Sequence, residues 1–242
     1  MRFMLALLGL ALAAAPLAHA ADDRYAAAVA DSARPDADRA ADAHRKPAEM
    51  LAFARVRPGD TVIELIPGRG YFTRLLSRAV GPNGVVYAVS PSMAGMDTAA
   101  KAIAADPRYP NVRPVVFDPA ALAALPKADV IFTAQNYHDL HLTRVHQDVP
   151  AQDRLFFSLL KSGGRLIVID HVALAGAPVT ETADALHRID PAFARHEIEG
   201  AGFVFDGESR ALANPDDPHT ANVFDPAIRG RTDQFAFRFV RP

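Results

Sequence analysis

Short apolar runs alternate along this chain with segments that mix apolar and polar residues. In the stretch Thr61–Leu76, residues 61–66 form an apolar, β-branched run, and residues 71–76 place apolar side chains at helical spacing. Gly68 and Gly70 join the two parts. A strand that turns on glycines into a helix leaves backbone N–H groups free above the turn. The pattern therefore predicts a ligand-binding turn.

The same alternation continues downstream and predicts a doubly wound sheet. The expected strands cover residues 61–66, 85–89, 112–117, 130–133, 165–169, 203–205 and 235–240. The expected helices cover residues 71–79, 98–105, 151–160 and 190–202, and a turn is expected at 161–164. This order predicts a Rossmann-like α/β fold with a mostly parallel seven-stranded sheet. The strand at 235–240 is expected to be antiparallel, half exposed and paired with the sixth strand.

The first 20 residues are predicted to be a signal peptide outside the fold. Arg2 is the positive n-region, residues 3–15 are an apolar run, and Ala18–Ala20 is an A-x-A cleavage site. The apolar run is shorter than the about 20 residues that span a bilayer, which argues against a membrane anchor. We therefore expect cleavage after Ala20, a periplasmic or secreted protein, and no stable membrane insertion.

Residues 21–56 predict an N-terminal helical arm, and residues 57–242 predict one α/β domain. The arm is alanine-rich and charged, and Pro47 fits the first turn of its last helix. Its charges favour a solvated face with ion pairs inside the helices. The alternative is an arm that caps the ligand site and provides Arg45 or Lys46 for an anionic group.

Composition narrows the choice of partners. The chain has 242 residues, of which 50% are apolar and 22% are charged, and its formal net charge is -2. These values are ordinary for one globular domain. No basic stripe stands out, so we expect no nucleic acid partner. The chain has no cysteine, which is compatible with an oxidising compartment. No feature of the sequence predicts the oligomeric state.

Polar residues gather where the predicted strands end. In open α/β sheets, ligands bind beyond the carboxyl ends of the strands. The residues at these ends are Pro67, Gly68, Gly70, Ser90, Asp118, Asn136, Tyr137, His138, Asp139 and His171. Glu64 adds a carboxylate just before the glycine turn, where it would repel a phosphate. We therefore expect a ligand other than a simple phosphate.

The segment Glu64–Gly70 and the later stretch LKSGGRLIVIDH resemble the class I S-adenosylmethionine-dependent methyltransferases. The match is closer to a bacterial, exported group of predicted methyltransferases. That group has a proline before the first motif glycine, an N-Y-H-D segment, an L-H-R-I-D segment and an R-G-R-T-D-x-F ending. These features occur here at Pro67, 136–139, 186–190 and 229–235. The resemblance covers residues 38–242.

This resemblance implies S-adenosylmethionine as the cofactor. It implies that Gly68 and Gly70 let the backbone approach the methionine part of the cofactor, with Pro67 and Tyr71 beside them. It further implies that Glu64 lies near the ammonium of the cofactor or an adjoining water. The resemblance thus explains why a carboxylate stands at this position.

Four other positions complete the comparison with the family. Asp118 matches the acidic position that commonly contacts the adenine amine, and Asn136 matches the segment that faces the reactive methyl group. The chain departs from the family at Ile66, which replaces the first glycine. It also departs at Ser90, which replaces the acid that normally holds both ribose hydroxyls, and a serine offers one weaker hydrogen bond there.

Histidines are candidates for proton removal from a methyl acceptor. Those at strand ends or in loops are His138, His171, His187 and His219. His138 with Asp139, or His171 with Asp170, could form a base with an orienting partner. A structural role is favoured for each one taken singly. A metal site from His138, Asp139 and His141 is an alternative, but no recognised ligand spacing supports it, so no metal is predicted.

Two functions remain open at this stage. The favoured one is methyl transfer from S-adenosylmethionine to an unidentified small molecule. Its catalytic residues are expected to be Asn136, Tyr137, His138 and His171, and an anionic substrate is expected to be held by Arg188, His219 or Arg231. The alternative is an exported, non-catalytic protein that uses the same fold to hold an adenosyl or amino-acid ligand. The predicted export motivates this alternative, because S-adenosylmethionine is made in the cytoplasm.

Overall fold

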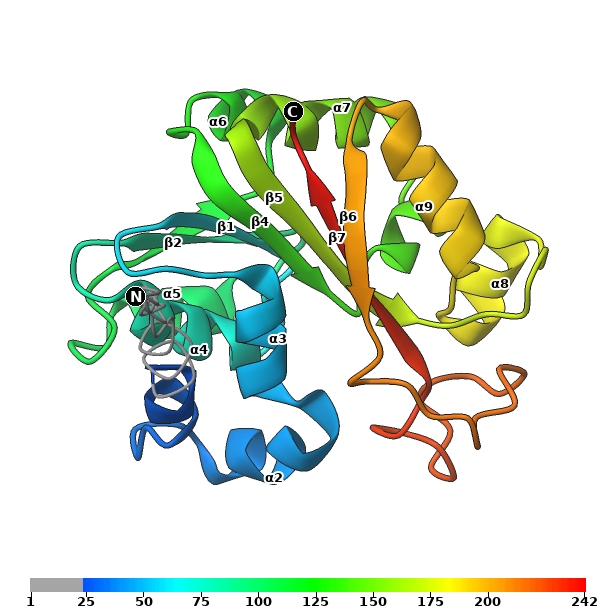
Figure 1. Cartoon of the computed structure of the whole chain (residues 1–242), viewed down its shortest axis with the longest axis horizontal. Helices are drawn as coiled ribbons and strands as arrows, with labels where there is room; N and C mark the ends of the chain where they lie inside the picture. The colour runs from blue at the N-terminus through cyan, green and yellow to red at the C-terminus, as the bar shows by residue number, and fades with distance from the viewer. Residues whose placement is uncertain (1–23) are drawn as a thin grey trace, which may run out of the picture.

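A mixed sheet of seven strands lies at the centre of the protein (Figure 1). The computed structural model describes residues 24–242, so the predicted signal peptide lies outside the described residues. The strand order is β3-β2-β1-β4-β5-β7-β6, and β7 runs antiparallel to both of its neighbours. The predicted Rossmann-like, doubly wound sheet with an antiparallel C-terminal strand is therefore confirmed.

The elements follow one another in the predicted alternation. The strands are β1 (Thr61–Leu65), β2 (Val85–Ser90), β3 (Val112–Val116), β4 (Ala128–Ala134), β5 (Leu160–His171), β6 (Val204–Ser209) and β7 (Gln234–Val240). The helices are α2 (Asp36–Arg45), α3 (Pro47–Ala54), α4 (Tyr71–Val80), α5 (Thr98–Ala104), α6 (Pro119–Ala123), the 3-10 helix η1 (His138–His141), α7 (Val149–Leu159), α8 (Val179–Leu186) and α9 (Pro191–Gly200). The hydrophobic pattern does not predict α6, η1 or α8.

Helices cover both faces of the sheet. The helices α3, α4 and α5 pack on one face, and α7 and α9 pack on the other (Figure 1). Val62 of β1 belongs to the first core with Leu75 of α4, whereas Ile63 belongs to the second core with Phe156 of α7. Successive strand residues point to opposite faces. The strand is therefore mostly apolar because both of its faces are covered.

Aspartates and prolines fix the starts of three helices. Asp118, Asp148 and Asp190 cap α6, α7 and α9, and each carboxylate accepts a hydrogen bond from a backbone N–H of the first turn. These bonds measure 2.8, 3.0 and 2.9 Å. Each helix also has a proline in its first turn, where no intrahelical N–H is needed. The predicted start of α9 at Asp190 and Pro191 is confirmed.

The structure corrects two predictions, one about β7 and one about β5. β7 is buried over residues 234–239 and is not half exposed, because it lies between β5 and β6 and not at the edge of the sheet. The segment 161–164, predicted as a turn, lies within β5. There the N–H of Gly163 donates to the carbonyl of Arg241 at 2.7 Å, so the chain continues its pairing with the C-terminal residues.

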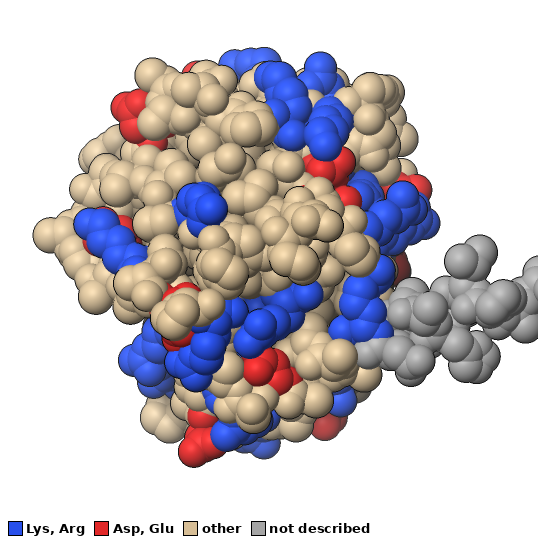
Figure 2. All heavy atoms as spheres, turned by 90° about the vertical axis from the view of Figure 1, so that its left-hand side faces the viewer, with Lys and Arg blue, Asp and Glu red and all other residues tan. Residues whose placement is uncertain are grey.

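Charged side chains connect the N-terminal arm to α4. Arg74 pairs with Asp38 at 3.0 Å, and Arg78 pairs with Asp31 at 2.6 Å. On the side that carries α4 and α5, basic side chains are interspersed with acidic ones and with uncharged surface (Figure 2). Among the described residues, no helix is long and apolar enough to cross a membrane.

Candidate functional site

Two cavities adjoin at the carboxyl ends of the strands. The polar cavity has a volume of about 960 Å³ and includes residues that follow β1, β4 and β5. The apolar cavity has a volume of about 640 Å³ and includes residues that follow β1, β2 and β3. Both volumes are typical of ligand pockets. The residues that line both cavities are Leu65, Ile66, Asn136, Asp139 and Arg144.

The glycine turn borders the polar cavity. Gly68 and Gly70 both have positive φ, at 56° and 79°. A Cβ at Gly70 would clash with the side chain of Ile103, so packing requires this glycine. A Cβ at Gly68 would meet no atom within 4 Å, and Gly68 lines the polar cavity. The turn therefore presents bare backbone to the cavity at Gly68.

Three non-glycine residues with left-handed backbone conformations line the same cavity. They are Ile66, Gln135 and His187, with φ of 51°, 65° and 55°. This conformation costs about 1–3 kcal/mol and is rarest for a β-branched residue. Hydrogen bonds hold Ile66 in place, because its N–H donates to Val89 at 2.8 Å and its carbonyl accepts from Asn136 Nδ2 at 3.1 Å. Ile66 thus holds a backbone conformation that favours glycine.

One acidic side chain, Glu64, and one basic side chain, Arg45, line the polar cavity near the glycine turn. Glu64 is 4% exposed, and its Oε2 atom has no hydrogen-bond partner. Burial raises the pKa of Glu64 to about 7. Arg45 of α2 lies with Cζ 4.2 Å from the centroid of the Tyr71 ring, and its Nη2 atom donates to Gln135 at 3.3 Å. The arm therefore contributes Arg45 to the cavity, whereas Lys46 does not line it.

His138 is fixed by the carboxylate of Asp170. Its Nδ1 lies 2.8 Å from Oδ1 of Asp170, and its backbone N–H donates to Oδ2 at 2.7 Å. Although burial lowers it, the pKa of His138 is raised overall by the Asp170 carboxylate, and the same pairing keeps the pKa of Asp170 below its ordinary value despite burial. An ionised Asp170 accepts the Nδ1–H hydrogen, so Nε2 of His138 is directed away from Asp170.

Asp139 and His187 lie beside Nε2 of His138. Oδ1 of Asp139 is 3.4 Å and Nδ1 of His187 is 3.3 Å from this atom, and these two atoms are 3.7 Å apart. His187 reaches the cluster because it is the left-handed C-cap of α8. His141 does not belong to it, since its Nε2 lies 3.0 Å from Glu197. The structure therefore groups His187, and not His141, with His138 and Asp139.

His171 also lines the polar cavity but is separately bonded. Its Nδ1 atom lies 2.7 Å from the hydroxyl of Thr232. Burial lowers the pKa of His171 to about 4, so the ring is neutral near pH 7. It can hold a hydrogen bond to a ligand but is a weak base.

The predicted cofactor and catalytic residues fall into three groups. Seven line the polar cavity: Glu64, Pro67, Gly68, Tyr71, Asn136, His138 and His171. Tyr137 lines the apolar cavity, but its hydroxyl lies 2.8 Å from Asp153 and 2.9 Å from Glu197 and is engaged within the protein. Neither cavity is lined by Gly70, Ser90 or Asp118.

Ser90 and Asp118 nevertheless lie close to residues of the apolar cavity. Ser90 is fully buried, and its hydroxyl has no hydrogen-bond partner, whereas the next residue, Pro91, lines the cavity. Asp118 is exposed and uses Oδ1 to cap α6, and its neighbour Phe117 lines the cavity. Each side chain therefore retains an oxygen that is not bonded within the protein.

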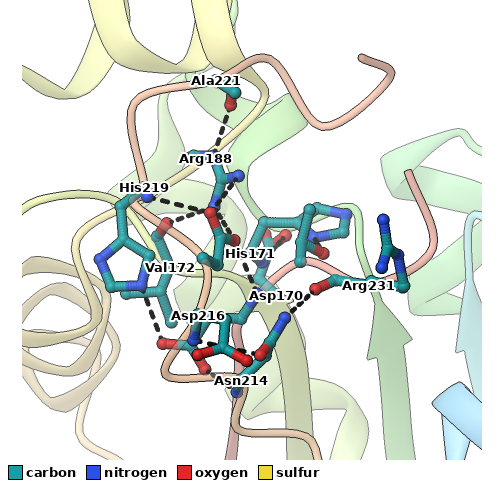
Figure 3. A network of polar contacts seen from close by, with 12 residues as sticks. Asp170, His171, Val172, Arg188, Asn214, Asp216, His219, Ala221 and Arg231 are labelled. Carbon is teal, nitrogen blue, oxygen red and sulfur yellow. Dashed lines mark hydrogen bonds and ion pairs between the residues drawn. The ribbon is translucent and has the colours of Figure 1, made fainter. Parts of the chain in front are cut away.

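Arg188 lies outside the lining of both cavities and is completely buried (Figure 3). Its guanidinium donates to Asp217 at 2.8 and 3.1 Å and to the carbonyl groups of Val172 and Ala221, both at 2.9 Å. These contacts fix the loop between β6 and β7. The guanidinium is thus engaged with the protein and not with the cavity that was expected to hold the substrate.

The two other residues predicted to bind the substrate also lie outside both linings. His219 has Nε2 2.9 Å from Asp233 within the same loop. Arg231 is exposed and donates to the carbonyl of Ala227 at 2.5 Å. Sequence reasoning missed several residues that do line the polar cavity, among them Gln135, Arg144, Phe224 and Arg229. Gln135 directly precedes one recognised motif and Arg229 begins another, whereas no local pattern marks Phe224.

The overall fold is shared with solved structures. No protein-family model matches the sequence, and no curated protein is similar to it. An S-adenosylmethionine-dependent methyltransferase from Aquifex aeolicus is 18% identical, with a TM-score of 0.56, over 80% of this chain and 88% of that one. One from Mesorhizobium loti is 14% identical, with a TM-score of 0.57, over 83% of this chain and 100% of that one. The chain shares the Rossmann-like fold of these two methyltransferases.

Proposed function

We propose that this protein transfers a methyl group from S-adenosylmethionine to a small molecule. The observation that carries the proposal is Glu64, a buried carboxylate with one unpartnered oxygen, which lines the same cavity as Arg45 beside an open glycine turn. An amino acid carries one ammonium and one carboxylate, so it matches a site with one acid and one base. A phosphate would not use the acid.

The two cavities suit the two parts of the cofactor. Glu64 would bind the ammonium of the methionine part, Arg45 its carboxylate, and the backbone at Gly68 leaves room for the chain between them. The adenosine would occupy the apolar cavity between Met93 and Phe117, where apolar surface removed from water favours binding. Ser90 and Asp118 adjoin this cavity through their neighbours Pro91 and Phe117.

Chemistry would occur where the cavities meet. S-adenosylmethionine supplies a methyl group on a positively charged sulfur, and in-line positioning accounts for much of the rate. Asn136, held by its bond to Ile66, lies at the junction. The acceptor would occupy the rest of the polar cavity, against His138 and its neighbours, and lose its proton there. Arg144 would steady an anionic acceptor, because it lines both cavities.

We also infer export by residues 1–20, as in the bacterial group that the sequence resembles. The A-x-A site and the absence of cysteine support this inference. The acceptor would then be a molecule of the periplasm or the medium, and the cofactor would have to reach that compartment.

Calorimetric titration with S-adenosylmethionine and S-adenosylhomocysteine tests the proposal. We expect saturable binding of both ligands, which Gly68→Val abolishes because its side chain would fill the cavity at the turn. The matched control is Gly59→Val, since Gly59 also has positive φ and open space but lies at the start of β1. Circular dichroism checks that both variants fold. No heat from either ligand at millimolar concentration would refute the proposal.

A further inference from the structure

We propose that His138, Asp139 and His187 bind one divalent transition-metal ion in the wall of the polar cavity. Their Nε2, Oδ1 and Nδ1 atoms all lie within 4.8 Å of one another. The three separations are 3.3, 3.4 and 3.7 Å. Ligand atoms about 2.1 Å from one ion lie about 3.0–3.5 Å apart at octahedral or tetrahedral angles. The cluster therefore needs only small shifts to enclose an ion.

The surroundings of His138 are those of a metal ligand. Asp170 accepts the Nδ1–H hydrogen at 2.8 Å and the backbone N–H of His171 at 2.8 Å. A carboxylate behind an imidazole fixes the tautomer and directs the other nitrogen at the metal. Nε2 of His138 is thereby presented to Asp139 and His187 as a ligand atom.

The charge balance also favours a cation. Asp139 and the fully buried Asp170 bring two carboxylates into the cluster, and buried carboxylates need compensating charge. Arg144 lines both cavities but makes no hydrogen bond to either carboxylate among the described residues.

Ligand type and exposure indicate which ion would bind. Two imidazoles and one carboxylate suit Zn²⁺, Mn²⁺ or Fe²⁺, whereas Mg²⁺ and Ca²⁺ prefer oxygen ligands. The side chains of His187 and Asp139 are 18% and 29% exposed, and both residues line the polar cavity. The ion would therefore keep coordination positions open toward a ligand in the cavity.

The role of the ion rests on the proposed methyl transfer and names an acceptor class. A small molecule with a hydroxyl group would bind the ion through its oxygen, and the ion would lower the pKa of that hydroxyl. The O–H bond breaks and the proton passes to water. The oxygen then forms the new bond to the methyl carbon as the bond from that carbon to sulfur breaks, leaving S-adenosylhomocysteine.

Metal titration of the full chain, treated with a chelator and kept free of cofactor, tests the site. We expect one Zn²⁺ per chain, visible absorption from bound Co²⁺, and no displacement of Co²⁺ by millimolar Mg²⁺. His187→Asn should weaken Zn²⁺ binding at least tenfold, and asparagine tolerates the positive φ at this position. Asp170→Asn should weaken it about 10–100-fold. His44→Asn, in the same cavity but outside the cluster, should change nothing.

Two outcomes would overturn the site. One is the absence of Zn²⁺ binding at concentrations up to about 100 μM. This result would show that the two imidazoles only share a hydrogen bond. The other is Zn²⁺ binding that His187→Asn leaves unchanged. Because the metal titration contains no cofactor and the calorimetric titration contains no metal, failure of either proposal is visible without the other.

Discussion

The two cavities share five lining residues but differ in the segments of the chain that form them. The apolar cavity takes most of its lining from segments that directly follow β1, β2, β3 and β4, with side chains such as Ile66, Met93 and Phe117. The polar cavity draws on the arm, η1, the end of α8 and the loop before β7, through Arg45, His187 and other residues. Nonspecific apolar contact thus comes from local sequence, whereas charged and titratable groups are assembled from distant segments.

The largest effect is expected when the loop between β6 and β7, which helps to line the polar cavity, loses its anchor. Arg188→Met leaves Asp217 buried without its partner, and removal of one member of a buried ion pair costs about 3–5 kcal/mol. We expect urea unfolding to report a loss of this size. Arg195→Met, in an exposed pair with Glu199, should cost less than about 1 kcal/mol. Equal losses in the two variants would show that the buried pair does not anchor the loop.

Glu64 allows a pH test of the polar cavity. Because burial raises its pKa to about 7 in the folded protein from an ordinary value of 4.5, the protonated acid is favoured in the native state. Its contribution to stability is complete below pH 4.5, falls as the pH rises toward 7, and amounts to about 3 kcal/mol. Glu64→Gln should remove this dependence and be the more stable protein at pH 8.

The same substitution should act in the opposite direction on binding. The cofactor ammonium would stabilise the ionised acid, so the affinity of the original chain for S-adenosylmethionine should rise with pH up to about 7 and then level off. Urea unfolding and calorimetry at pH 5, 6, 7 and 8 measure the two effects together. A Glu64→Gln variant with unchanged pH dependence of both quantities would contradict the assignment of this carboxylate.

The smallest effect is expected at the boundary between the cavities. Ile66→Gly relieves a strained backbone worth about 1–3 kcal/mol but loses side-chain contacts and adds freedom to the unfolded chain. The net change in stability should lie within about 1 kcal/mol. Leu65→Gly, in the buried end of β1, should cost about 3 kcal/mol or more. Comparable losses in thermal unfolding would mean that Ile66 is not strained.

Sequence reasoning reaches the fold and the part of the site at the strand ends because both depend on local pattern. Residues 61–76 predict β1, the turn and α4, since apolar periodicity and glycines are read along the chain. Glu64, Gly68 and Asn136 lie together in the polar cavity, as expected from the rule that ligands bind beyond the carboxyl ends of parallel strands. Exposure of β7 is predicted wrongly because periodicity does not say which strand lies at an edge.

The rest of the site depends on long-range folding. Arg188 and His187 are neighbours in sequence, yet one is buried against Asp217 and the other faces the cavity. The left-handed conformation of His187 at the end of α8 causes this divergence. Positive φ is uncommon for any residue other than glycine, and the local sequence does not predict it at His187, so the cluster with His138 could not be predicted from spacing.

The position of β7 between β5 and β6 also constrains the order of folding. β6 joins the sheet only through β7, which pairs with β5 on its other side. Contacts between segments this far apart in sequence form late and slowly. During synthesis, β6 therefore has no partner until residues 234–240 have emerged, and the second core stays open for the same period. The last strand in the sequence is thus the one that completes the sheet and closes the second core.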